Sequence, residues 1–544
     1  MVRLAGILAS LALLTALAAI GRTRSIAAQS PTLTEVGNTA CAACHRAIYE
    51  TYSLTAMART SGPALANLIE GSFDHAPSGV SYRVRRAGDV ALLSYDRPGP
   101  QGLHGTQQLK YYVGSNSRGR TFLFGIDGFL YQSPINYYAA KRIWDMSPGY
   151  TQLREMELNH PVDRTCLFCH ASGVQPPVDG TVNRFAREPF LQPGVGCERC
   201  HGAGSDHVKS RGSMINPATL TAERRDSVCV QCHLEGAARI AKAGRTPYSY
   251  RPGETLSEFL AIFVRTDADA HGPGAVSQVE SLALSRCKRA AGDALSCIAC
   301  HDPHVQLTAG QKAGYYRAKC LGCHAAMATD HHSREHDCTA CHMPRIDSAD
   351  IGHTMVTDHR IVRIQRKDRP STSRPYTLTQ FGAPSPSARD LGLAYGEVAL
   401  SGDGFAAREA LRLLEEALPT HQDDPEVLTR LGYLYQLRGD VERTTSFYDR
   451  ALRIDPARAV VAANLGVFYI RQGMLTRALT LWRDTFDRNP QLTELGVNLG
   501  RALCASGDFA GALQVVRRAL EHNPDAGAAR QLLPEVTEGK CTRQ

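Results

Sequence analysis

The sequence predicts a mainly α-helical chain of two modules: the first carries a small antiparallel β insert, and the second is an α-solenoid. Three observations support this fold class. The pattern Cys-x-x-Cys-His occurs seven times, always before residue 360. Runs of alternating apolar and polar residues separate its first two copies. After residue 388 the sequence repeats with a period of 34 residues.

The repeated motif indicates covalent haem. In haem c the two thiols form thioethers to the porphyrin and the adjoining imidazole ligates the iron, so seven haem c groups are expected. Structural zinc and disulfides are the alternatives, and neither explains a histidine after every second cysteine. The predicted thioether residues are Cys41, Cys44, Cys166, Cys169, Cys197, Cys200, Cys229, Cys232, Cys297, Cys300, Cys320, Cys323, Cys338 and Cys341. The predicted proximal iron ligands are His45, His170, His201, His233, His301, His324 and His342.

The first module covers residues 36–360, which include every haem motif. We expect short helices to carry the motifs and the haems to form much of the core, giving a haem-packed cytochrome c domain. The β insert lies at about residues 75–140, and Ala87-Gly88-Asp89 and Asp127-Gly128 favour hairpin turns within it. The predicted strands are Val80 to Arg86, Val90 to Tyr95, Leu109 to Val113, Thr121 to Ile126 and Phe129 to Gln132.

The second module covers residues 388–536, after a linker at 361–387 that is rich in Arg, Ser, Pro and Thr. Its period and residue classes are typical of tetratricopeptide repeats, in which small residues let paired helices pack closely. We expect about four repeats and a final helix that ends near Val536. The residues that recur in register are Leu431-Gly432, Leu465-Gly466 and Leu499-Gly500, then Gly439, Gly473 and Gly507, and Pro456, Pro490 and Pro524.

Residues 1–28 have the pattern of a secretory signal peptide. A basic start precedes an apolar run from Leu4 to Ile20, and small residues surround Ala27 and Ala28. The alternative is an uncleaved anchor, because 17 apolar-leaning residues are near the lower limit for crossing a bilayer. We therefore expect an exported protein, periplasmic or otherwise extracytoplasmic, with membrane association only if this segment is retained.

The formal charge of +8 raises the question of a nucleic-acid partner. Removal of the signal takes away Arg3, Arg22 and Arg24 and leaves about +5. Each ferric haem adds about one net negative charge through its propionates, which brings the holoprotein to about −2. No nucleic-acid partner is therefore expected.

Three segments resemble those of a known lineage of multihaem c-type cytochromes, which includes tetrahaem cytochrome c, pentahaem nitrite reductase and hydroxylamine oxidoreductase. Relatives fused to C-terminal tetratricopeptide repeats are familiar in it. The resemblance covers about residues 36–360 and implies that His207 and His304 each ligate a neighbouring haem as its second axial ligand. The three segments are Cys197-Glu-Arg-Cys200-His201-Gly-Ala-Gly-Ser-Asp-His207, His301-Asp302-Pro303-His304 and Cys341-His342-Met343-Pro344.

The sequence departs from the pattern of these relatives at two positions. Ala203 replaces the usual proline, and Thr55-Ala56-Met57-Ala58 stands where relatives often have Ser-x-His-Ala. Met57 is therefore a candidate distal ligand that would raise the haem potential, and the alternatives are an open iron or a methionine that only packs on the porphyrin.

Further distal candidates follow from the number and context of the histidines. Of 20 histidines, seven belong to the motifs and two, His421 and His522, lie in the repeats, which leaves 11 for seven irons. Two imidazoles on every iron are therefore arithmetically feasible, and such irons are low-spin. The candidates chosen by their context are His336, His353, His359 and His75.

Seven haems in about 300 residues must lie close together, and close haems allow electrons to pass without moving parts. We interpret the chain as an electron carrier rather than an enzyme, whose repeats dock a redox partner protein. The alternative is an oxidoreductase that acts on a small nitrogen or sulfur compound at one open haem. No catalytic residue is predicted, because all seven motifs end in histidine, whereas pentahaem nitrite reductases generally have lysine at the catalytic iron.

Three cysteines lie outside the motifs. Cys287 is expected to be a free thiol, and Cys504 a small core residue of a repeat helix. A disulfide between Cys504 and Cys541 after export is the alternative for these two.

Overall fold

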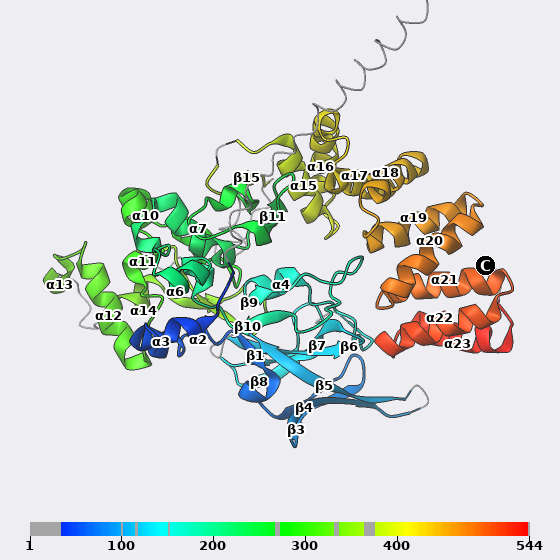
Figure 1. The fold of residues 1–544 in the computed structure, drawn as a ribbon, viewed down its shortest axis with the longest axis horizontal. Helices are drawn as coiled ribbons and strands as arrows, with labels where there is room; N and C mark the ends of the chain where they lie inside the picture. The colour runs from blue at the N-terminus through cyan, green and yellow to red at the C-terminus, as the bar shows by residue number, and fades with distance from the viewer. Residues whose placement is uncertain are drawn as a thin grey trace, which may run out of the picture.

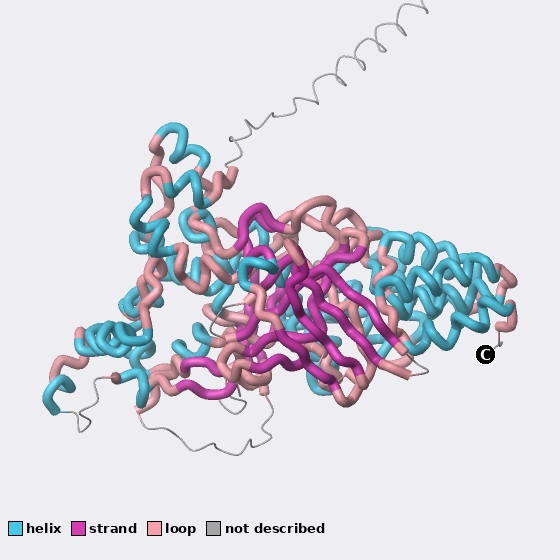
Figure 2. Tube along the Cα trace, turned by 90° about the horizontal axis from the view of Figure 1, so that it is seen from below, coloured by secondary structure: helices cyan, strands magenta, loops and turns pink. Residues whose placement is uncertain are grey.

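The computed structural model describes residues 34–99, 102–114, 118–150, 153–266, 273–330, 337–363, 376–383 and 385–541. The chain forms a helical lobe, a curved β-sheet and a stack of paired helices (Figure 1). The strands lie between the lobe and the stack (Figure 2). The predicted signal peptide, residues 364–375 and 384 of the predicted linker, and His336 lie outside the described residues.

The β-sheet has eight antiparallel strands, so the expectation of a small insert was wrong in extent. It begins at Ser61 and ends at Met146, and each of the five predicted strands is present. Seven strands pair in chain order from β2 to β8, and β1 pairs with β5. The strands are β1 (Ser61–Pro63), β2 (Gly71–His75), β3 (Val80–Ala87), β4 (Val90–Arg97), β5 (Leu103–Val113), β6 (Gly119–Ile126), β7 (Phe129–Tyr138) and β8 (Ile143–Met146).

The three strands that were not predicted, β1, β2 and β8, have weak strand patterns. β1 is Ser-Gly-Pro, β2 is Gly-Ser-Phe-Asp-His with Phe73 as its one strand-favouring residue, and β8 is only four residues long, Ile-Trp-Asp-Met. Tertiary contacts stabilise them instead. The sheet curls until Trp144 of β8 packs directly on Gly71 of β2, where a larger side chain would clash. The two edges of the sheet thereby meet.

The sheet has a hydrophobic core of its own. Tyr82, Leu93, Phe122 and Tyr131 are among its fully buried side chains. In β3 buried and exposed residues alternate, as expected for a strand with one solvent-facing side. This part of the first module is therefore packed by ordinary side chains, and it forms a rigid wall beside the haem motifs.

The helical lobe consists of short helices joined by loops, with three small sheets. Its helices are α2 (Asn38–Ala42), α3 (Arg46–Tyr52), α4 (Arg164–Phe168), α5 (Glu198–His201), α6 (Ser205–Ser210), α7 (Ala222–His233), α9 (Gln278–Leu284), α10 (Arg286–Ala291), α11 (Cys297–Cys300), α12 (Ala309–Leu321), α13 (Met327–Asp330) and α14 (Cys338–His342). Its strands are β9 (Ala171–Val174), β10 (Phe190–Pro193), β11 (Ala238–Ala241), β12 (Leu260–Arg265), β13 (Arg345–Asp347) and β14 (Met355–Thr357). The 3-10 turns are η1 (Ala64–Asn67), η2 (Pro217–Thr219), η3 (Pro247–Ser249), η4 (Leu256–Glu258) and η5 (Gly292–Ala294).

The C-terminal stack is a tetratricopeptide-type solenoid, with four helix pairs and a final helix as predicted. The recurring glycines lie where helices meet: Gly432 lies under the Tyr448 ring and Gly466 under the Trp482 indole. The helices are α15 (Ala388–Ala399), α16 (Gly404–Ala417), α17 (Pro425–Leu437), α18 (Val441–Ile454), α19 (Ala459–Arg471), α20 (Leu475–Arg488), α21 (Thr493–Ala505), α22 (Phe509–His522) and α23 (Gly527–Glu538), with the 3-10 turn η6 (Leu418–Thr420) after α16.

The first end of the stack is built into the helical lobe. Strand β15 (Leu378–Gln380), from the segment expected to be a linker, pairs with β12 in a sheet of order β11-β12-β15. Phe263 of β12 shares a buried cluster with Leu393 and Leu431 of the repeats. A partly buried ion pair joins Lys242 to Asp390, with 2.8 Å between Nζ and Oδ2.

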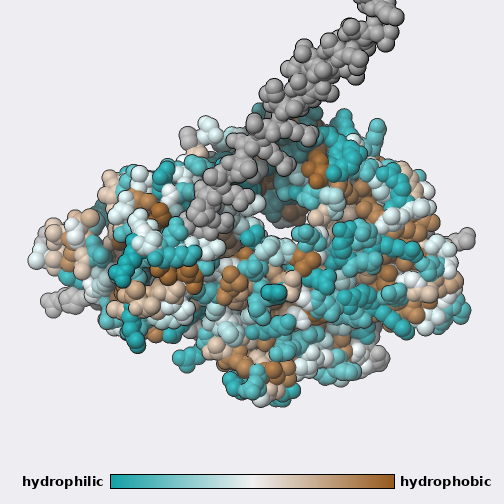
Figure 3. Space-filling view, viewed as in Figure 1, coloured by the Kyte–Doolittle hydropathy of each residue, from teal (hydrophilic) through white to brown (hydrophobic). Residues whose placement is uncertain are grey.

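The last end of the stack contacts the large β-sheet. Arg97 of β4 donates to the buried Asp525 carboxylate, with 2.8 Å between Nη1 and Oδ2, and the Met156 amide donates to the same carboxylate. Tyr131 of β7 and His522 of α22 are hydrogen-bonded at 2.8 Å. The stack is therefore an arch attached at both ends, and Figure 3 shows an opening through the molecule beside it.

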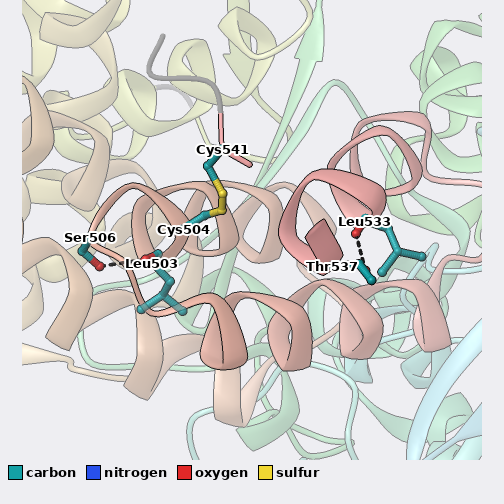
Figure 4. The surroundings of a disulfide bond; sticks show 6 residues. All are labelled: Leu503, Cys504, Ser506, Leu533, Thr537 and Cys541. Atoms are coloured by element: carbon teal, nitrogen blue, oxygen red, sulfur yellow. Dashed lines mark hydrogen bonds between the residues drawn. A yellow bond between two sulfur atoms is a disulfide. The ribbon is translucent and has the colours of Figure 1, made fainter. Parts of the chain in front are cut away.

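A disulfide closes the end of the stack. It joins Cys504 of α21 to Cys541, which follows α23 (Figure 4). The two Cα atoms are 5.9 Å apart, within the usual range for a disulfide. Among the described residues, no helix has the length and apolarity needed to cross a bilayer.

Candidate haem site

All seven motifs line one large cavity in the helical lobe. Its volume is about 4100 Å³, whereas pockets for a single ligand usually have about 300–1,000 Å³. Every motif cysteine and histidine lines this cavity except Cys44. The sheet contributes part of the wall, through Thr121, Gln132 and Asn136. The cavity has room for several large groups side by side.

Each motif forms one turn of helix at its attachment residues. The amide of His45 donates to the carbonyl of Cys41 at 2.9 Å, and His301 donates in the same way to Cys297 at 2.9 Å. In a helix, residues three and four positions apart lie on one face. The local fold therefore presents both thiols and the imidazole on one side of the helix, toward the same ligand.

Cysteines of different motifs lie near one another. In four pairs one thiol shifts the pKa of the other: Cys41 and Cys197, Cys169 and Cys232, Cys229 and Cys297, and Cys320 and Cys338. Burial, with a smaller effect of the nearby Cys232, raises the pKa of Cys200 to about 11. Burial also raises the pKa of Cys300, and Cys323 lies near enough to add to this shift. These neighbouring thiols relate all seven motifs in one series, with the second motif beside the fourth.

Three pairs of imidazoles face one another across the cavity. Their ring centroids are 6.2 Å apart for His45 and His207, 6.0 Å for His201 and His304, and 6.3 Å for His301 and His359. The ring planes within each pair meet at 20°, 16° and 33°, respectively.

This spacing fits an iron between two histidines. A metal–imidazole bond of about 2 Å on each side, plus roughly 1 Å from nitrogen to ring centre, separates the centroids by roughly 6 Å. In each pair, one histidine follows the cysteines of one motif and the other comes from a different segment of the chain. The described residues therefore fit haem with two axial histidines at the first, third and fifth motifs.

Hydrogen bonds orient several of these rings. The Nδ1 atoms of His201, His207 and His359 lie 2.8, 2.5 and 2.9 Å from the backbone carbonyls of Ile215, Gly212 and Thr357. Such a bond occupies Nδ1 and leaves Nε2 as the nitrogen that can bind a metal. This is the arrangement that a metal-bound histidine requires.

The other motif histidines differ in their surroundings. Burial lowers the pKa of His170 to about 4, and its Nδ1 lies 2.7 Å from the Thr60 hydroxyl. Burial also lowers the pKa of His233. His342 has its Nδ1 2.8 Å from the carbonyl of Val362. His324 lines the cavity and is exposed.

The remaining distal candidates fall in different places. Met57 lines the cavity. His75 lies in the large sheet, outside the cavity lining, with its Nδ1 2.8 Å from the Ser78 hydroxyl. His353 is also outside the lining, and its Nε2 lies 2.7 Å from Asp145 Oδ2.

The motif histidines also contact side chains from elsewhere in the chain that were not predicted as site residues. Thr60 and Tyr316 contact His170 and His301 through their hydroxyls. Neither residue belongs to a motif or a periodic pattern, so the sequence carries no signal for them. Arg118, Arg199 and Arg239 also line the cavity, and burial lowers the pKa of Arg118.

Comparisons with known proteins give a match in each of the two modules of the chain. The family model described as cytochrome c554 and c-prime matches residues 139–202, which include the second and third motifs, and a tetratricopeptide repeat model matches residues 469–533. A curated relative, the multiheme cytochrome MtrA of Shewanella baltica (strain OS185), is 24% identical over 186 residues. That match covers 30% of this chain and 52% of the relative, so the chain spans about half of the relative's length.

Solved structures of MamA align with the repeats. "MamA MSR-1 C2" is 26% identical with a TM-score of 0.25, covering 28% of this chain and 83% of that chain. "MamA RS-1 ArsTM double mutant" is 21% identical with a TM-score of 0.26, covering 29% and 87%. The sequence comparisons support a multihaem c-type cytochrome with tetratricopeptide repeats.

Proposed function

We propose that this chain is an exported multihaem c-type cytochrome that conducts electrons through haem c attached at all seven motifs. The main support for this proposal is the set of three imidazole pairs, each with the separation that an iron between two rings requires. The bound haems supply one-electron chemistry. The protein attaches them, orients their ligands and encloses them.

The contacts between motifs support a continuous path. Thiols of different motifs lie close enough to shift one another's pKa along the series from the first motif through the third, fourth, fifth and sixth to the seventh. The second motif joins the fourth. Because attachment residues this close hold their haems close, electrons cross the lobe without moving parts.

The proposed ligands follow from the geometry. The seven motif histidines are proximal ligands, and His207, His304 and His359 are the distal ligands at the first, third and fifth motifs. Met57 stays a candidate for another haem, because it lines the cavity. We propose that Arg118, Arg199 and Arg239 pair with haem propionates, because a guanidinium group binds a carboxylate through two hydrogen bonds.

The disulfide supports an exported location. Disulfides persist in oxidising compartments, and Cys504 and Cys541 are bonded. Haem attachment at Cys-x-x-Cys-His outside the cytoplasm agrees with this location.

We propose that a redox partner protein docks on the middle of the repeat arch, because both ends contact the rest of the molecule. Large apolar side chains are exposed there, at Leu437, Ile454, Val460 and Ile470. A photo-cross-linker at Val460 should join the chain to a protein with its own redox cofactor, and one at Arg412, on another repeat, should not. Products without a redox cofactor, or equal products at both positions, would contradict this docking site.

Haem attachment is tested by intact mass and by the spectrum of the denatured, washed protein. The wild type should carry seven haem masses, and the double variant Cys166→Ser/Cys169→Ser should carry one fewer. Cys287→Ser, which changes a cysteine outside the motifs, should keep all seven. A colourless wild-type polypeptide with the mass of the bare chain would refute the proposed function.

One observation favours a second candidate, an oxidoreductase acting on a small nitrogen or sulfur compound. Within the described part of the chain, His170, His233 and His324 face no second histidine at the spacing of the three pairs. An open iron at one of these motifs would be high-spin. Binding of nitrite, hydroxylamine or cyanide to a high-spin ferric haem would favour catalysis, and a wholly low-spin spectrum would favour the carrier.

A further inference from the structure

Thr60 and Ser61 hold the histidine of the second motif by two different atoms. The Thr60 hydroxyl oxygen lies 2.7 Å from Nδ1 of His170. The next hydroxyl, of Ser61, donates to the backbone carbonyl of His170 at 2.6 Å and accepts from the Gly194 amide at 2.8 Å. One contact therefore reaches the ring, and the other reaches the main chain.

These two residues are rigidly placed by the sheet. Thr60 is 7% exposed and Ser61 is 2% exposed. Ser61 begins β1 and pairs with Val113 of β5, and the Gly114 amide donates to the Thr60 carbonyl at 2.8 Å. The main chain at Thr60 is consequently held by the sheet rather than by the motif.

The partner of Nδ1 at His170 is a side-chain hydroxyl, as it is at His301, whereas two other motif histidines face backbone carbonyls. His201 and His342 have Nδ1 next to the backbone carbonyls of Ile215 and Val362, at 2.8 Å each. A backbone carbonyl is present whatever the side chain is. A threonine hydroxyl is present only because of the residue type, so this contact can be removed by one substitution without altering the backbone.

The contact has an electronic consequence when the imidazole ligates iron. Nε2 then binds the metal, so Nδ1 carries the hydrogen and donates it to the Thr60 oxygen. An acceptor at Nδ1–H makes the imidazole a stronger donor and stabilises ferric iron, which lowers the potential. Loss of the acceptor should raise the potential of this one haem.

We propose that Thr60 is a positioning residue that orients the His170 imidazole and lowers the potential of the haem at the second motif. This inference rests on the proposed function, because it requires haem at Cys166 and Cys169. It assigns a tuning role to a residue outside every motif.

The test is a spectroelectrochemical titration of the full-length holoprotein. Thr60→Val keeps the shape and removes the acceptor. In Thr60→Val, the part of the absorbance change that comes from one haem should occur at a more positive potential. The parts that come from the other haems should keep their potentials. Thr60→Ser restores a hydroxyl and should return the shifted part toward the wild-type potential. If valine prevents assembly, Thr60→Ala removes the same acceptor with a smaller side chain.

Ser61→Ala is the matched control. It removes the neighbouring hydroxyl, which contacts the same histidine through its backbone only, so it should lower stability without shifting any potential. Unchanged potentials in Thr60→Val with all seven haems present would overturn the inference alone. An equal shift in Ser61→Ala would also overturn it, since packing would then explain both. A wild type without haem at Cys166 and Cys169 would overturn the proposed function instead.

Discussion

The imidazoles of His201 and His304 face each other with ring centroids 6.0 Å apart and planes only 16° from parallel. His201 belongs to the third motif, whereas His304 follows the fifth. The fold therefore brings two segments that are far apart in the chain to one site. Because an iron between them would bind both segments, ligation there would also tie the lobe together.

Replacement of the second histidine of a pair should open one iron. His359→Ala removes the ring that faces His301 at 6.3 Å, so one low-spin ferric haem should become high-spin. Electron paramagnetic resonance of the oxidised protein measures this change. His353→Ala is the control, because His353 contacts Asp145 outside the cavity lining and should leave the spectrum unchanged. A high-spin haem in His353→Ala and an unchanged spectrum in His359→Ala would instead make His353 the distal ligand.

Breaking the contact between Arg97 and Asp525 should weaken the attachment of the repeats to the sheet. The Asp525 side chain is 4% exposed, and it also accepts from Arg530 at 3.0 Å. Asp525→Ala leaves a largely buried guanidinium without its carboxylate, which costs about 3 kcal/mol of unfolding free energy. Urea titration followed by circular dichroism measures the loss. Arg412→Ala breaks only exposed pairs and should change stability by less than about 0.5 kcal/mol.

Acid should destabilise the same interface through His522. This side chain is fully buried, and burial, with a smaller effect of Arg518, lowers its pKa to about 4. Above pH about 6.5 the imidazole is neutral in both folded and unfolded chains. As the pH falls toward 4, the unfolded chain binds the proton first, so unfolding free energy falls by at most about 1.4 kcal/mol per pH unit.

Denaturation midpoints between pH 4 and 7 test this prediction. His522→Gln, which does not titrate, should show a shallower loss of stability across that window than the wild type. The comparison is of slopes, because the variant also loses the bond to Tyr131 and is expected to be less stable throughout. Equal slopes would exclude His522 as a source of the acid sensitivity.

The disulfide should stabilise the last repeat. Its cysteines are 37 positions apart, and closing a loop of that length stabilises by about 2–4 kcal/mol, chiefly by restricting the unfolded chain. Cys541→Ser should lower the thermal midpoint, and dithiothreitol should lower the wild type to the same value without affecting the variant. Cys287→Ser should have no effect, because Cys287 is a free thiol. A wild type insensitive to reductant would contradict the prediction.

The repeats were predictable because their stabilisation is local. Each helix packs on its neighbours in the sequence. The same position of successive repeats is therefore glycine, at Gly432 and Gly466, because the ring of Tyr448 or Trp482 packs against it. Strands β3 to β7 were predictable for a similar reason, since hairpin turns such as Asp127-Gly128 join neighbours in the chain. Both residues of that turn have positive φ, 53° and 84°.

The sequence by itself determined the covalent chemistry expected of this protein and the helices of its repeats, because motif spacing and periodicity are local properties of the chain. Only the tertiary structure decided which histidines face each other, that Thr60 contacts His170, and that the repeats are attached at both ends. These relationships join residues far apart in the chain. They depend on how separate elements pack, and no local pattern records that packing.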